Sequence, residues 1–315
     1  MSLRLAAGRV RHAPLVDCPP DPRPGARRRA SARAVAAVAL TALATAGLTG
    51  AQPAQAAAYS APTTVPVVGA TLGDADGVAV SPSGTTYVLD GAGSGQVVAL
   101  SASGQVLAVL GLGATTGIGA VSNPQGLAVD SAGAGRLLIA DTDKHRVVST
   151  PLPTLSTTST PTSATAVLTL VAGGAAGGGA PLEGPAASSP LKSPAGVAWD
   201  AATSSLYIAD TGNNQVEKVT GGALTIVAGT GVAGSTNTGT ARTTQLSTPE
   251  DVAVGASGDL FVADTGNGGV LKVSGGAATS VAAVAGVDAL TTAGGDVIAA
   301  GTTSVTVITG SSTAS

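Results

Sequence analysis

Two stretches near the middle of this 315-residue chain carry one pattern: LYIADTGNNQVEKV at 206–219 and LFVADTGNGGVLKV at 260–273. In each, a short apolar run reaches Asp-Thr-Gly-Asn, and a second run rich in Val follows. Short β-branched and aromatic runs bounded by Gly, Asn and Asp are typical of strands joined by turns. The pattern therefore predicts a β-hairpin, with Asp-Thr-Gly-Asn acting as turn chemistry because Asp and Asn bond the local backbone.

Working outward, the hairpin belongs to a longer repeat of four short apolar runs. Copies begin near residues 77, 126, 196, 251 and 287, and the last is the most degenerate. No window of 12 or more residues shows a capped helical period. Four strands per unit, repeated, is typical of a β-propeller. We predict an all-β propeller of five four-stranded blades, with six blades as the alternative.

The two ends of the repeat region predict how the ring closes. The fifth copy supplies only three runs, while the orphan run TVPVVG at 64–69 precedes the first copy and resembles the fourth strand of the others. Pairing of this N-terminal strand with the fifth blade would leave no long sheet edge open. One slot of the repeat holds large apolar residues, which we expect to pack between blades: Tyr87, Leu138, Tyr207, Phe261 and Ile298.

The first 56 residues have the pattern of a leader. Arginines precede an apolar run over 34–50, and Ala54-Gln55-Ala56 follows, as in a secretory signal peptide with its cleavage site. The apolar run is shorter and poorer in large residues than a membrane span needs. We expect cleavage after Ala56, so that 57–315 forms the propeller, is secreted into the extracellular space and keeps no membrane span.

Composition excludes several classes of function. Only 10% of residues are charged, and the chain has one Cys, Cys18, inside the leader. Residues 57–315 hold seven Lys or Arg against sixteen Asp or Glu, a formal charge of −9. Nucleic-acid binding depends on cationic contacts with phosphates, so we expect no nucleic-acid partner. A disulfide framework is excluded as well.

The repeat resembles the NHL repeat, on GVAWD at 196–200, LYIADTGNNQV at 206–216 and LFVADTGN at 260–267. The linker from Val227 to Pro249 is similar to the long inter-blade loop of secreted bacterial NHL proteins, the branch that resembles the teneurin propeller. The resemblance spans about 64–309. It implies a propeller of four-stranded blades, and it does not imply one activity.

Candidate chemical groups are few after residue 56. His145 is the lone His there, which is too few for the zinc sites of NHL-type lyases and weak support for a streptogramin-lyase-like acid or base. Lactonase-like propellers hold calcium with Glu, Asn and Asp from several blades, whereas residues 57–315 have only three glutamates, Glu183, Glu217 and Glu250. Glu250 precedes the first run of its repeat, a position that could place it near the ring axis. Asp141 and Asp143 could offer two calcium oxygens, although a solvated turn explains them better. We assign no catalytic, cofactor-binding or metal-ligating residue.

Residues 150–165 (TPLPTLSTTSTPTSAT) form a Ser/Thr/Pro-rich insert within the second unit. We expect a disordered surface excursion, with O-glycosylation as the alternative. For the whole chain we expect a monomeric, non-enzymatic binding module for a protein or cell-envelope ligand. The alternatives are a hydrolase or lyase with an acidic, calcium-dependent site, and an extracellular sensor module.

Overall fold

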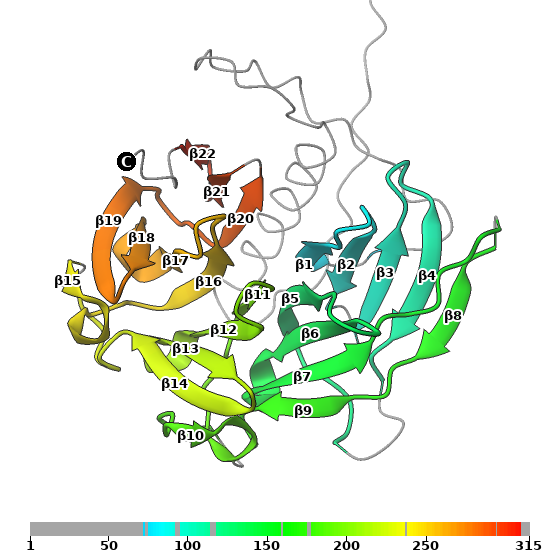
Figure 1. Cartoon of the computed structure of the whole chain (residues 1–315), viewed down its shortest axis with the longest axis horizontal. Coiled ribbons are helices and arrows are strands. Elements are labelled where there is room, and N and C mark those ends of the chain that lie inside the picture. The colour runs from blue at the N-terminus through cyan, green and yellow to red at the C-terminus, as the bar shows by residue number, and fades with distance from the viewer. Residues whose placement is uncertain are drawn as a thin grey trace, which may run out of the picture.

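The computed structural model describes residues 72, 75–91, 95–113, 118–158, 160–174, 178–236, 238–293 and 295–309. In these ranges the chain forms strands β1 to β22 and five single-turn 3₁₀ helices. The strands make five sheets, which Figure 1 shows arranged around one axis. The predicted all-β, five-bladed propeller is therefore confirmed.

Each blade is an antiparallel meander that runs outward from the axis. The innermost strands of blades 1 to 5 are β1 (Ala75–Val80), β5 (Pro124–Asp130), β11 (Gly196–Asp200), β16 (Pro249–Val254) and β20 (Ala289–Ala293). The second strands are β2 (Thr86–Asp90), β6 (Arg136–Asp141), β12 (Ser205–Asp210), β17 (Leu260–Asp264) and β21 (Asp296–Ala300). The third are β3 (Gln96–Leu100), β7 (Arg146–Pro151), β13 (Gln215–Thr220), β18 (Gly269–Ser274) and β22 (Val305–Ile308). The fourth, in blades 1 to 4, are β4 (Val106–Gly111), β9 (Thr169–Ala172), β14 (Ala223–Ala228) and β19 (Ala277–Ala283).

The core lies in the seams between neighbouring blades. Four of the aliphatic clusters each join one blade to the next. Four residues of the predicted slot, Tyr87, Leu138, Tyr207 and Phe261, belong to these clusters, and Ile298 is buried as well. Their predicted role in packing is confirmed. Lys218 stands opposite Tyr207, and Lys272 opposite Phe261, each with its ammonium over the ring.

The turn after the second strand fastens the blades. In blades 2 to 4 the Asp that ends this strand accepts, at 2.7 Å, a backbone N–H from the loop entering its own blade. The Thr that follows donates to a backbone carbonyl at the entrance of the next blade. The pairs are Asp141 with Ser122, Asp210 with Lys192, Asp264 with Ser247, Thr142 with Pro194, Thr211 with Pro249, and Thr265 with Val287. The prediction of turn chemistry is confirmed, and the turn also joins adjacent blades.

The hairpin at this turn is a 3₁₀ helix closed by a left-handed residue. The helices are η1 (Thr142–Lys144), η3 (Thr211–Asn213) and η5 (Thr265–Asn267). They end at His145, Asn214 and Gly268, with φ of 56°, 53° and 68°. Asn and Gly tolerate this conformation best among ordinary residues, which explains Asn214 and Gly268 at this position.

The Ser/Thr/Pro-rich insert is not the disordered excursion that its composition predicts. Its strand β8 (Thr162–Thr165) adds to the outer edge of blade 1, parallel to β4 (Figure 1). Leu152 and Leu155 pack against the cluster between blades 1 and 2, and Ser156 N–H donates to the Leu107 carbonyl at 3.0 Å. The insert leaves blade 2 and returns to it, so it straps two blades together.

The linkers into blades 3 and 4 add short outer strands in the same manner. Strand β10 (Gly184–Pro185) pairs with β14, and β15 (Gly239–Thr240) pairs with β19. The remaining 3₁₀ helices, η2 (Ala186–Ser188) and η4 (Ala241–Thr243), follow these strands directly. Each linker therefore contributes a fifth strand to the blade that follows it.

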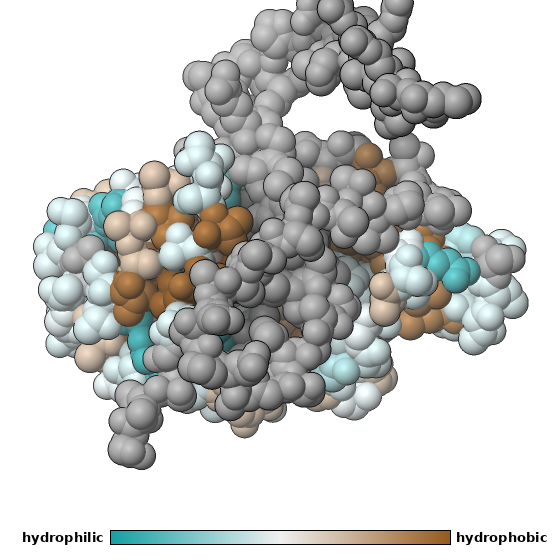
Figure 2. Space-filling view, turned by 90° about the horizontal axis from the view of Figure 1, so that it is seen from above, coloured by the Kyte–Doolittle hydropathy of each residue, from teal (hydrophilic) through white to brown (hydrophobic). Residues whose placement is uncertain are grey.

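Blade 5 has three strands among the described residues, and β22 is its outermost. The view from above Figure 1 shows hydrophobic residues gathered over the C-terminal blades (Figure 2). Val281 of blade 4 and Val305 of blade 5 are exposed. The predicted closing strand at 64–69 and the leader at 1–56 lie outside the described residues. Within the described ranges, no helix has the length and apolarity to cross a bilayer.

Candidate binding site

The inner strands of neighbouring blades approach one another closely at three glycines. A Cβ added at Gly77 would stand 2.8 Å from the Gln125 carbonyl oxygen of the next blade. At Gly126 the corresponding distance to the Ala195 carbonyl is 2.4 Å. Gly196 is placed in the same way against blade 4. These approaches leave room for no side chain, so the inner strands come into close contact around the axis.

Blade 4 departs from this pattern, because Asp251 stands where blades 1 to 3 have glycine. Its Oδ2 accepts the Leu290 N–H at 2.8 Å, and its Oδ1 accepts the Val252 N–H at 2.9 Å. The carboxylate thus joins β16 to β20 of blade 5. Comparison of the repeats would have revealed Asp251, since a charged residue replaces glycine at one equivalent position.

A cavity of about 260 Å³ lies on the axis and draws its lining from the inner-strand regions of all five blades. The polar lining residues are Asp76, Gln125, Asp251, Asp288, Thr291 and Thr292. The described lining holds three aspartates and no Lys, Arg or His. Backbone groups of five strands and acidic side chains together make a polar site of negative potential.

His145 lies away from this cavity, in the turn between β6 and β7. Its Nδ1 lies 2.9 Å from the backbone nitrogen of Ser193, whose N–H it accepts. Asn214 occupies the equivalent position in blade 3 and accepts the Thr248 N–H at 2.9 Å. The structure thus gives His145 a role in joining blades.

Asp141 and Asp143, in the turn between β6 and β7, are both hydrogen-bonded to neighbouring residues of blade 2. Asp141 is fully buried and bonds Arg146 Nε at 2.7 Å. Burial raises the pKa of Asp141, while the Ser122 N–H and Arg146 oppose that rise. Asp143 accepts from Asn123 Nδ2 at 3.2 Å. The carboxylates considered as calcium ligands thus form hydrogen bonds within the protein.

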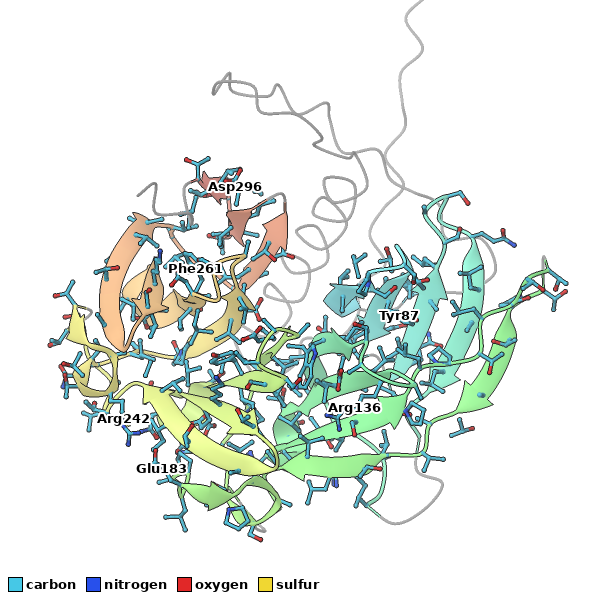
Figure 3. The ribbon with its side chains drawn as sticks, viewed as in Figure 1. Tyr87, Arg136, Glu183, Arg242, Phe261 and Asp296 are labelled. Atoms are coloured by element: carbon cyan, nitrogen blue, oxygen red, sulfur yellow. The ribbon has the colours of Figure 1, made fainter. Side chains whose placement is uncertain are left out.

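The three glutamates occupy three different settings. Glu183 is exposed at the outer edge of blade 3 and pairs with Arg242 at 2.7 Å; Figure 3 labels both side chains there. The hydrogen bond from Arg242 lowers the pKa of Glu183. Glu217 is fully buried in β13, and Glu250 is buried in β16. Among the described residues, no cluster of three His, Cys, Asp or Glu side chains could hold a metal ion.

Comparisons with known proteins support the fold and carry no information about activity. No family model matches the chain, and no curated protein matches it. A protein of unknown function from Bacteroides thetaiotaomicron is similar, with a TM-score of 0.54 and 16% identity. The match covers 71% of this chain and 56% of that one.

A chain of a nidogen/laminin complex is similar at a TM-score of 0.50 and 16% identity, with 71% of both chains covered. A streptogramin B lyase matches at a TM-score of 0.46 and 11% identity, over 76% of this chain and 66% of that one. The third likeness is too low to support an argument about activity. The first two agree with the blades and seams described above: the chain is a β-propeller.

Proposed function

We propose that this protein is a secreted, NHL-type propeller that binds a cell-envelope ligand without transforming it. The observation that carries the proposal is the axial cavity, to which all five blades contribute. Ligand sites are concave and contain a few polar groups that fix orientation. A cavity built from five blades has that form, and a rigid ring holds it.

The size and charge of the cavity limit the kinds of ligand that it can bind. About 260 Å³ lies just below the roughly 300–1,000 Å³ of sites that enclose a drug-sized molecule. The cavity therefore suits one end group of a larger molecule, such as a sugar unit or an amine-bearing side chain. Asp76, Asp251 and Asp288 favour hydroxyl and ammonium groups, because a carboxylate accepts hydrogen bonds and repels anions.

A binding role agrees better with the side chains than the hydrolase or lyase alternative does. The lone described histidine, His145, is held by Ser193, and the glutamates considered as calcium ligands occupy different settings. General acid–base catalysis needs a titratable group within hydrogen-bond reach of the substrate. If the protein were an enzyme, Asp76, Asp251 and Asp288 in the axial cavity would be the candidate acids or bases.

Binding is tested with the immobilised protein and two fractions of the producing organism's envelope, one of polysaccharide and one of protein. Thr291→Arg places a large cation in the cavity lining, and Thr303→Arg makes the same change in an exposed turn of blade 5. We expect saturable binding that Thr291→Arg abolishes and Thr303→Arg preserves. Equal binding by the two variants would contradict the axial site.

Secretion is tested separately. Protein recovered from culture medium should begin at Ala57, after Ala54-Gln55-Ala56. Recovery only from cells, with residues 1–56 intact, would contradict export. Calorimetry with calcium and with chelator tests the calcium alternative: a melting temperature that chelator lowers and calcium restores would support it.

A further inference from the structure

One seam between blades contains a carboxyl group at a position where blades 1, 2 and 4 have aliphatic residues. Glu217 lies in β13 with none of its surface exposed. It stands two residues before Val219, which belongs to the cluster between blades 2 and 3, so it faces the same seam. The equivalent residues of blades 1, 2 and 4 are Val98, Val148 and Leu271, all buried.

Glu217 has no hydrogen-bond partner for either carboxylate oxygen among the described residues. A buried ionised carboxylate without a partner is strongly unfavourable, because neither water nor a hydrogen bond offsets its lost hydration. The same group in its neutral, protonated form is far less costly. The geometry of this seam therefore favours a protonated Glu217.

The acidic residue whose charge acts on Glu217 is Asp210, which ends the paired strand β12. Asp210 is fully buried and accepts the Lys192 N–H at 2.7 Å and Asn213 Nδ2 at 2.6 Å. In blade 2 the equivalent aspartate, Asp141, has the Arg146 guanidinium at 2.7 Å. Blade 3 has Gln215 in place of that arginine. At these two positions of its third strand, blade 3 thus has a carboxyl group where blade 2 has Val148, and it lacks the cation that Arg146 provides in blade 2.

The groups around the pair come from three elements. Blade 2 contributes aliphatic residues to the seam, among them Ala140 and Val147. The linker into blade 3 contributes Lys192, whose charge acts on Asp210, and Leu191. On β13 itself, Lys218 lies on the other side of the sheet, over Tyr207. The described surroundings of Glu217 thus supply no cation that could replace a lost proton.

We propose that the buried pair of Glu217 and Asp210 retains one proton in the folded protein and acts as a pH-sensitive latch on the seam between blades 2 and 3. With the proton bound, the pair has one negative charge, which the Asp210 hydrogen bonds accommodate. When the proton leaves to water, two adjacent buried carboxylates repel each other and the seam loosens. Strands β5 and β11 on either side of this seam both line the axial cavity. The latch acts on the fold and does not depend on what the cavity binds.

The directions of the pKa shifts agree with this arrangement. Burial, and then the charge of Asp210, raises the pKa of Glu217 well above its ordinary value. Burial raises the pKa of Asp210 to about 7. A carboxyl with a raised pKa binds its proton more tightly in the folded state than in the unfolded state. The stabilising contribution of the bound protons is therefore complete below about pH 4, declines as the pH rises through about 7, where Asp210 loses its proton, and declines further where Glu217 loses its own.

The test compares the full chain with Glu217→Gln and Glu217→Leu, at pH 5.5 and 8.5. Glu217→Leu introduces the residue type that Leu271 provides at the equivalent position of blade 4. It therefore keeps the test valid if the Glu217→Gln protein fails to fold. Glu183→Gln, at the exposed edge of the same blade, is the control. The melting temperature of the unmodified protein and of the control should fall with rising pH by at least about 3 °C more than that of either Glu217 variant.

Hydrogen exchange locates the effect. After correction for intrinsic exchange rates, protection of amides in β7 and β13 should fall about tenfold between the two pH values, and protection in β17 and β18 should not. Glu217→Leu should abolish this difference. The same pH dependence in the leucine variant, or loss of protection spread evenly over all blades, would overturn the proposal.

Discussion

The imidazole of His145 accepts the backbone N–H of Ser193 across the seam between blades 2 and 3, at 2.9 Å from Nδ1. Asn214 makes the same bond across the next seam, to Thr248. Both donors immediately precede a proline at the start of an inner-strand region. A residue that invites a catalytic interpretation in the sequence is one member of a repeated fastening between blades.

His145→Asn should therefore be tolerated, because asparagine makes this bond in blade 3 and accepts the left-handed conformation. We expect a change in unfolding free energy within about 0.5 kcal/mol. His145→Ala loses the acceptor, and alanine tolerates the left-handed conformation less well than histidine, so the variant should cost about 1–2 kcal/mol. Urea unfolding at neutral pH distinguishes the variants. Equal stability of the two would show that the bond to Ser193 contributes nothing.

Thr248 is a β-branched residue with φ of 45°, which is strained. Blade 2 has Asn123 at the equivalent position, with φ of 50° and a proline after it. Thr248→Asn should raise the unfolding free energy by about 0.5–1 kcal/mol, part of the cost of a left-handed residue. Thr303→Asn, in an exposed turn without positive φ, is the control. A Thr248→Asn protein that unfolds at lower denaturant would refute the strain argument.

The glycine at Gly126 is required by its neighbour across the seam, because an added Cβ would lie 2.4 Å from the Ala195 carbonyl oxygen. Gly126→Ala should lower the unfolding free energy by about 1–3 kcal/mol, as overpacking does in cores. Gly111→Ala is the matched control, since its Cβ would have only a 3.8 Å neighbour. Thermal unfolding of the pair tests this, and similar losses in both would contradict the close approach of β5 and β11.

The sequence was sufficient for the repeat, the turn chemistry and the buried slot at Tyr207 and Phe261, because these depend on local residue patterns. Composition misled for 150–165, since Ser, Thr and Pro suggest disorder. Long-range backbone pairing of β8 with β4 and the anchoring of Leu152 and Leu155 give that segment its structure. The axial aspartates escaped notice for a similar reason: only the ring closure of distant strands brings Asp76 and Asp251 to one cavity.

The insert at 150–165, which joins blades 1 and 2, should contribute to stability. Replacing 153–165 with a short Gly-Ser link removes Leu155 from the seam and uncovers the edge of β4. We expect a loss of at least about 2 kcal/mol, the scale for one buried leucine. Thr157→Ala combined with Ser163→Ala, which alters exposed hydroxyls only, should be neutral. A strap deletion as stable as the intact protein would contradict this account. The intact mass of the secreted protein tests O-glycosylation of the same segment.

Closure of the ring through residues 64–69 stays a prediction. Deleting 64–69 from the chain that begins at Ala57 should lower the melting temperature, since β22 would then keep an open edge. Deleting 57–63, which resembles no strand of the repeat, should have little effect. If both deletions leave the melting temperature unchanged, the N-terminal segment does not complete blade 5.

The most direct test of the proposed function is a footprint of the bound ligand. Hydroxyl-radical labelling with and without the envelope fraction that binds would report which side chains become protected. The axial site predicts protection at the accessible cavity residues Val78 and Val80, and unchanged labelling at Leu182 and Val167 on the outer parts of the ring. Protection confined to the outer residues, with the cavity labelled as before, would contradict the axial binding site.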